Sequence, residues 1–144
     1  MINSALSKNI DNQLLINQLE GLLNQRKDDL LKKLFLQKSF NQFNKQYLAF
    51  REKYKDAKWS IQPLSNDQNK SLLDIKIRST REINDQIYNL YTKQTVKVET
   101  YKNKIKRYEV IDEESILNSK KSPLIIKIAS PDKVLTGERY EMNL

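Results

Sequence analysis

The sequence predicts an α+β fold, in which N-terminal helices pack on a curved, cone-shaped antiparallel sheet and a C-terminal β-hairpin follows. Before Trp59, apolar residues recur at helical spacing, and after it they alternate with polar residues, as strands require. The chain has 144 residues, 38% apolar and 31% charged, which is typical of one globular domain with its own core. Helices and strands therefore belong to one unit.

Three helical segments are expected before Trp59. The first carries an apolar stripe with Asp11 as its N-cap, Asp28 opens a short second segment, and Ser39 caps the third. The two stripes are Ile10, Leu14, Leu15, Leu19, Leu22 and Leu23 in the first helix, and Phe40, Phe43, Tyr47, Phe50 and Tyr54 in the third. We expect the aromatic stripe to rest on the sheet and Arg51 to lie on the solvent side.

The strands are expected over residues 58–64, 71–81, 88–101 and 105–111. Pro63 places the first strand at an edge of the sheet or at its own end. Asn84 and Asp85 tolerate the positive φ of a hairpin loop, and Asn103 stands where the next turn often has a glycine. The last three strands therefore form a meander with one apolar face.

The expected organisation is helices plus sheet over residues 1–115, a polar linker over 116–122 and a β-hairpin over 123–144. The hairpin strands are residues 123–128 and 140–144, joined around Pro131 and Thr136-Gly137. This pair resembles the first two strands of an immunoglobulin-like sandwich, which implies that the chain is a fragment containing the start of a second β domain. The alternative is that the hairpin extends the first sheet.

Composition limits the chemistry. The chain has no His, no Cys and two glycines, so the usual general base, most transition-metal ligands and phosphate-binding glycine loops are missing. We expect no cofactor and no metal site. The apolar runs are too short for a transmembrane segment, so the expected location is cytoplasmic, or stromal if the protein is organellar. Abundant Lys, Asn and Ile are typical of an AT-rich genome.

The net charge of +8 includes one local basic cluster, followed at once by acidic residues. The cluster, a candidate anion-binding site, consists of Lys93, Lys97, Lys102, Lys104, Lys106 and Arg107. It could contact phosphates or an anionic membrane surface. The alternative is a solvated sheet edge that lysines keep from aggregating. Nucleic acid is not an expected partner, because no exposed aromatic pair is flanked by arginines and glycines.

The order of elements resembles the nuclear transport factor 2-like superfamily, which includes ketosteroid isomerases and SnoaL-type cyclases. The resemblance covers residues 10–112 and rests on an aromatic helix running into Trp59, on the strand around Thr95-Val96-Lys97-Val98-Glu99, and on Asn103-Lys104-Ile105. It implies a bent sheet whose concave face forms a pocket or a protein-binding surface. Enzymes of the family use an Asp, often with His or Tyr, inside the cone. Here Asp74 is predicted on the polar face of its strand.

Three aromatic residues, Tyr47, Trp59 and Tyr88, are the candidate lining of such a pocket, with core packing as the alternative. The favoured function is a non-catalytic protein-interaction or assembly module that binds a protein partner or a second copy. An isomerase-like or dehydratase-like protein with an aromatic cavity is the first alternative. A basic adaptor for RNA or an anionic membrane is the second.

Overall fold

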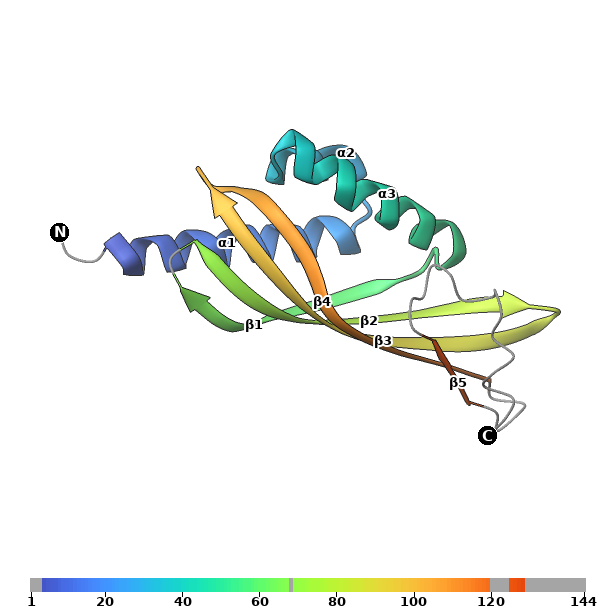
Figure 1. The fold of residues 1–144 in the computed structure, drawn as a ribbon. Helices are drawn as coiled ribbons and strands as arrows, with labels where there is room; N and C mark the ends of the chain where they lie inside the picture. Colours follow the sequence, from blue (N-terminus) through green and yellow to red (C-terminus); the bar gives the residue numbers. More distant parts are fainter. Residues whose placement is uncertain (1–3, 68, 120–124, 129–144) are drawn as a thin grey trace.

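The computed structural model describes residues 4–67, 69–119 and 125–128, with side chains described for 12–67 and 69–119. Helical segments come first: α1 (Ser4–Asn24), α2 (Asp28–Leu31), the 3₁₀ turn η1 (Lys32–Leu34) and α3 (Gln37–Lys53). The strands are β1 (Lys58–Asp67), β2 (Lys70–Ile83), β3 (Gln86–Tyr101), β4 (Lys104–Ser119) and β5 (Ile125–Ile128). The predicted α+β fold, with helices before strands, is confirmed (Figure 1).

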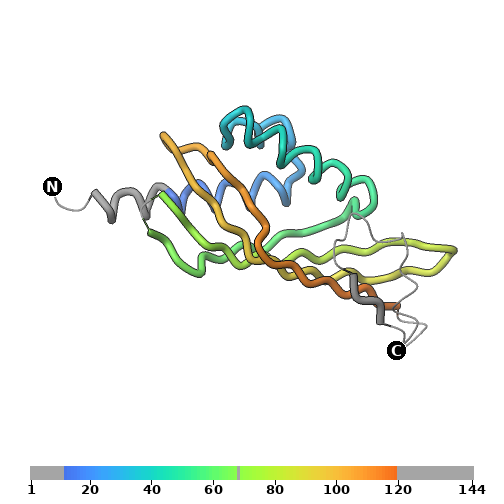
Figure 2. Tube along the Cα trace, in the orientation of Figure 1, coloured from blue at the N-terminus to red at the C-terminus, as the bar shows by residue number. Residues whose placement is uncertain are grey.

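The strands form one open antiparallel sheet in chain order, β1-β2-β3-β4-β5. Asn84 and Asp85 join β2 to β3, and Lys102 and Asn103 join β3 to β4, all with φ between 51° and 65°. Positive φ at both loop residues matches the right-handed twist of the flanking strands, which confirms both predicted turns. The helices lie on one side of the bent sheet, and the β2–β3 hairpin extends away from them (Figure 2). No helix in the described residues is long and apolar enough to cross a membrane.

The core lies between the helices and the concave, helix-facing side of the sheet. Leu19 and Leu23 of α1 are buried with Tyr47 of α3, as are Ile75 of β2 and Val96 of β3. Alternate residues of β2 and β3 point to this side, as the period of two predicts. The expected packing of α3 on the sheet is therefore confirmed, with Phe43 half-buried at its margin.

Three predictions about the helices are wrong. Helix α1 begins at Ser4, so Asp11 lies inside it, and Leu14 is 57% exposed while Ile16 is buried instead. Helix α3 begins at Gln37 with Leu36 as its N-cap, so Ser39 lies inside the first turn of the helix. The Ser39 hydroxyl donates to the carbonyl oxygens of Leu36 at 2.9 Å and Ile105 at 2.6 Å, and so ties α3 to β4.

Arg51 was expected in solvent, and it is 3% exposed. Its guanidinium donates to the carbonyl oxygens of Leu23 (2.6 Å) and Ala57 (3.2 Å) and lies 4.7 Å from the centre of the Trp59 ring. The prediction fails because the end of α1 and the loop after α3 both present carbonyl groups to this side of the helix, and a guanidinium has enough donors for both.

The predicted linker over 116–122 is wrong for its first part. Residues 116–119 continue β4, where Leu117 is fully buried opposite Leu90. Strand β5 pairs with β4 from Ser115 to Asn118, so the first predicted hairpin strand joins the same sheet. Residues 120–124 and the second hairpin strand, 140–144, lie outside the described residues.

Residues of α1 and of the segment before α3 cover open backbone groups of β1 and β4. Asn24 accepts from the Trp59 N–H at 2.7 Å and donates to the Trp59 carbonyl at 2.9 Å, while Glu20 accepts from the Ile61 N–H at 2.8 Å. On β4, the Leu36 N–H donates to the Ile105 carbonyl at 2.9 Å. These bonds satisfy backbone groups that an uncovered edge strand leaves open.

Candidate functional site

A groove of about 900 Å³ lies between α3 and the concave side of the sheet, next to β4. Its floor is aromatic: Phe43, Tyr47, Phe50, Trp59 and Tyr108 come from α3, β1 and β4. The α3 residues stand one helical turn apart and therefore share a face of the helix. Tyr108 faces them from β4, and its ring meets Phe43 edge-to-face at 5.0 Å.

The rings of the floor hold one another in place. Phe43 stacks on Tyr47 with centroids 5.5 Å apart, and Tyr47 lies 6.0 Å from Trp59. Such pairs add about 0.5–1.5 kcal/mol each beyond the area that they bury. The floor is therefore a rigid apolar surface before any ligand arrives.

Polar groups fix the orientation of Tyr47. Its hydroxyl donates to Asp28 at 2.7 Å and accepts from Arg51 Nε at 3.1 Å. Burial raises the pKa of Tyr47, and the hydrogen bond to Asp28 also raises it, whereas Arg51 acts in the opposite direction. The phenol stays protonated, and its hydrogen bonds join α2 to α3.

A carboxylate and an amide line the β4 side of the groove. Gln94 Nε2 donates to Glu113 Oε1 at 2.6 Å, and both residues are half-buried on the concave side. Burial raises the pKa of the Tyr108 phenol, and the charge of Glu113 raises it further. Tyr108 is thus a hydrogen-bond donor at neutral pH, not a base.

The structure brings together two of the three predicted pocket residues. Tyr47 and Trp59 line the groove, whereas Tyr88 lies near the β2–β3 hairpin, where its hydroxyl donates to Gln86 Oε1 at 3.3 Å. Tyr88 shares the concave face with the others but comes before Gln94 along β3, nearer the β2–β3 turn and outside the groove.

The predicted basic cluster is divided between two surroundings. Lys93 and Lys97 point to the open side of the sheet, opposite Glu114 and Glu109 of β4. Arg107 forms an ion pair with Glu99 at 3.3 Å. Lys102, Lys104 and Lys106 are exposed at or next to the β3–β4 turn. Two of the acidic residues that follow the cluster in the sequence, Glu109 and Glu114, therefore lie on β4 beside Lys97 and Lys93 of β3.

One stretch of β4 has an open backbone edge. Outside the pairing with β3, the described hydrogen bonds and strand pairings of this edge are with Phe35, Leu36 and Ser39 at Ile105, and with β5 from Ser115 onward. Residues 106–112 lie between these contacts, and within the described part of the chain their strand partners, where they have any, are on β3. Val110 and Ile111 are 37% and 51% exposed there, beside the groove.

Sequence reasoning missed Gln94, Tyr108 and Glu113. Two bulges in β4 explain why Tyr108 and Glu113 were missed, because Lys106 and Ile111 each have no opposite residue on β3. Each extra residue moves the following side chains to the other face. Glu113 therefore faces the groove, although simple alternation from Tyr108 places it on the open side. The acid-rich sequence gives no signal of a bulge at Ile111.

Among the described residues, no three His, Cys, Asp or Glu side chains gather as potential metal ligands. Comparisons with protein-family models and with curated proteins found no match to this chain.

Proposed function

We propose that this protein is a non-catalytic interaction module of the cytoplasm, or of an organellar stroma, whose groove between α3 and β4 binds an extended segment of a partner protein. The observation that carries the proposal is that the aromatic groove meets the open backbone edge of residues 106–112. A segment laid along this edge would gain main-chain hydrogen bonds, and its alternate side chains would enter the groove.

The lining favours a particular kind of segment. Aromatic rings suit apolar or cationic side chains, and the carboxylate of Glu113 suits Lys or Arg. Val110 and Ile111 offer apolar contact at the edge. The expected ligand is an extended peptide that alternates apolar and basic residues.

Selection from a library of short displayed peptides, followed by titration of the enriched sequence, tests the proposal. Val110→Lys should weaken binding at least tenfold, because it places a cation at the groove beside the bound basic segment. Leu48→Lys is the matched control, since Leu48 is 49% exposed on α3 but does not line the groove. No enrichment, or equal losses in the two variants, would refute the proposal.

The partner can also be a second copy of the chain, which would then pair along the same edge of β4, residues 106–112. Sedimentation at micromolar concentration should then show a dimer that Val110→Lys weakens and Leu48→Lys preserves. If the protein is strictly monomeric, a second copy is excluded and the partner must be a different protein.

A second candidate is an isomerase-like or ligand-carrying protein, favoured by the Glu113 carboxylate that Gln94 holds above an aromatic floor. The resemblance to the nuclear transport factor 2-like superfamily supports it. Thermal-shift titration with a panel of steroid-like amphipathic compounds, repeated with Glu113→Gln, tests this candidate. A stabilising compound that loses its effect in the variant would favour it over the peptide-binding proposal.

A further inference from the structure

The side of the sheet away from the helices, here called the open face, carries cations that repel one another. Lys76 of β2 stands directly opposite Lys93 of β3, and Arg78 follows on the same face of β2. Like charges opposite each other destabilise a sheet. Among the described residues, none of these three cations forms an ion pair, although Glu114 stands opposite Lys93. Their arrangement is suited to an anionic ligand.

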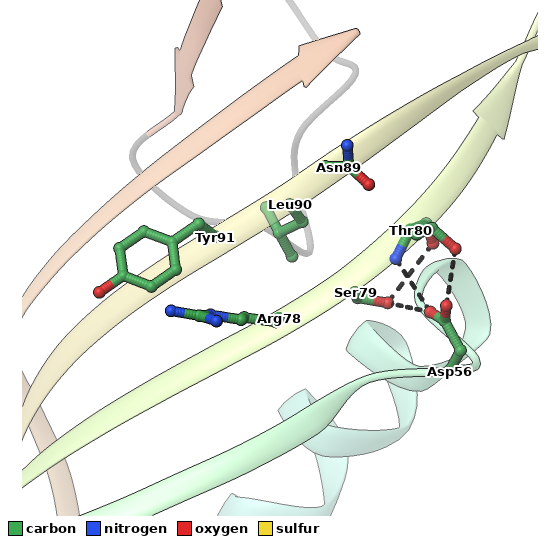
Figure 3. Close-up of a pocket in the computed structure, with 7 residues that line it drawn as sticks. All are labelled: Asp56, Arg78, Ser79, Thr80, Asn89, Leu90 and Tyr91. Carbon is green, nitrogen blue, oxygen red and sulfur yellow. Dashed lines mark hydrogen bonds between the residues drawn. The ribbon is translucent and has the colours of Figure 1, made fainter. Parts of the chain in front are cut away.

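A hollow adjoins these cations. It measures about 570 Å³ and is lined by Arg78, Thr80, Asn89 and Tyr91, among others (Figure 3). The Arg78 guanidinium lies 5.3 Å from the centre of the Tyr91 ring. Asp56 closes one end of the hollow, and its carboxylate accepts from the Thr80 N–H at 2.9 Å and the Thr80 hydroxyl at 2.6 Å. Because these bonds already engage the carboxylate, Asp56 is a fixed part of the wall.

We infer that the open face binds single-stranded RNA. This surface and this partner are distinct from the groove between α3 and β4 and its proposed peptide ligand. Phosphates would lie on Lys76, Lys93 and Arg78, and one base would enter the hollow against Tyr91. Asn89 supplies both a donor and an acceptor for a base edge or a ribose 2′-hydroxyl. A flat lipid surface would use the cations but not the hollow, so the hollow favours RNA. The basic cluster predicted from the sequence shares only Lys93 with this site.

Fluorescence anisotropy with a labelled oligouridylate at several salt concentrations tests the inference. The open-face variant is Lys76→Gln, Arg78→Gln and Lys93→Gln together. The matched control is Lys102→Gln, Lys104→Gln and Lys106→Gln, which removes the same charge near the β3–β4 turn. The open-face variant should bind at least tenfold more weakly, and its log affinity should fall less steeply with log salt, by about two units for three lost phosphate contacts. The control should stay near wild type.

Tyr91 provides an independent test. Tyr91→Ala should weaken RNA binding about tenfold because stacking is lost, and Tyr91→Phe should retain it. Circular dichroism and thermal melting establish that each variant is folded, and the comparison of the two triple variants decides the test if Tyr91→Ala is not.

Four results would overturn the inference. Equal losses in the two triple variants would indicate generic attraction to a basic protein. A wild-type dissociation constant within the generic range of roughly 10⁻⁴ to 10⁻⁶ M at physiological salt would show that no specific site exists. Binding to phosphatidylserine vesicles that needs the three cations, without RNA binding, would assign the face to a membrane. Equal affinity for oligothymidylate would exclude recognition of the ribose.

Discussion

The guanidinium of Arg51, on α3, connects this helix to the end of α1 and to the segment before β1. It binds the carbonyl of Leu23 at the end of α1 and that of Ala57 before β1, and it donates to the hydroxyl of Tyr47. A buried guanidinium needs hydrogen-bond acceptors placed around it, since a missing acceptor leaves a desolvated N–H group. Arg51 therefore fixes how α1, α3 and β1 meet.

Replacing Arg51 by Met should destabilise the fold by about 2–4 kcal/mol, because the carbonyls of Leu23 and Ala57 lose their donors while much of the packing volume is kept. Urea unfolding measures the change. Arg107→Met is the control, since its side chain is 60% exposed and its ion pair should contribute no more than about 1 kcal/mol. Equal effects would contradict the role given to Arg51.

Asp56 also connects separate parts of the chain, because its carboxylate, in the segment before β1, accepts hydrogen bonds from Ser79 and Thr80 of β2. Burial alone would raise its pKa, but hydrogen bonds from Ser79 and Thr80 outweigh burial and lower the pKa of the carboxyl. The ionised carboxylate thus stabilises the fold above the ordinary aspartate pKa of about 3.9, and this stabilisation is lost as the pH falls through the lowered value.

Asp56→Asn should therefore be less stable than wild type at neutral pH, with a difference that shrinks as the pH falls below about 4. Urea unfolding across a pH series measures it. Asp67→Asn, at an exposed position near the end of β1, should show no such convergence. A difference between wild type and Asp56→Asn that does not vary with pH would contradict the assignment.

Among the elements, α1 acts as a cover for the edge of β1. Trp59 and Ile61 present backbone groups outward at this edge, and Asn24 and Glu20 satisfy them. The sequence shows α1 as an apolar stripe and gives no sign that its polar residues serve the sheet.

Asn24→Ala should cost about 1–3 kcal/mol, because two buried or half-buried backbone groups of Trp59 lose their partners. Asn41→Ala, exposed on α3, is the control and should change stability little. Chemical unfolding gives the free energies, and faster hydrogen exchange at the Trp59 amide would locate the effect. Unchanged exchange at Trp59 would show that α1 does not protect this edge.

At the scale of the whole molecule, one core extends from α1 to β4. Ile75 lies at its centre and is fully buried. Ile75→Ala should therefore destabilise the protein by about 2–5 kcal/mol. Thermal melting checks this, with Ile87→Ala as the control because Ile87 is 61% exposed. An unchanged midpoint for Ile75→Ala would contradict the packing of helices on the sheet.

The sequence predicted features that depend on neighbours along the chain. The alternation in β2 and β3, the turns at Asn84 and Asn103, and the aromatic stripe of α3 all follow from local periodicity and backbone preference. Features set by distant residues were not predictable. Arg51 is buried because carbonyls elsewhere in the chain meet it, and Glu113 faces the groove because of a bulge that depends on pairing with β3.

The bulge at Ile111 also determines which gene changes the protein can tolerate. Deleting this one codon would remove the residue that has no partner on β3, so Asp112 and Leu117 would keep their partners Thr95 and Leu90 and their faces of the sheet. Deleting Ile116 instead, which lies opposite Tyr91, would turn the buried Leu117 toward the open side. Single-residue deletions should therefore be tolerated at the two bulges, Lys106 and Ile111, and removed by selection from the regular part of the strand.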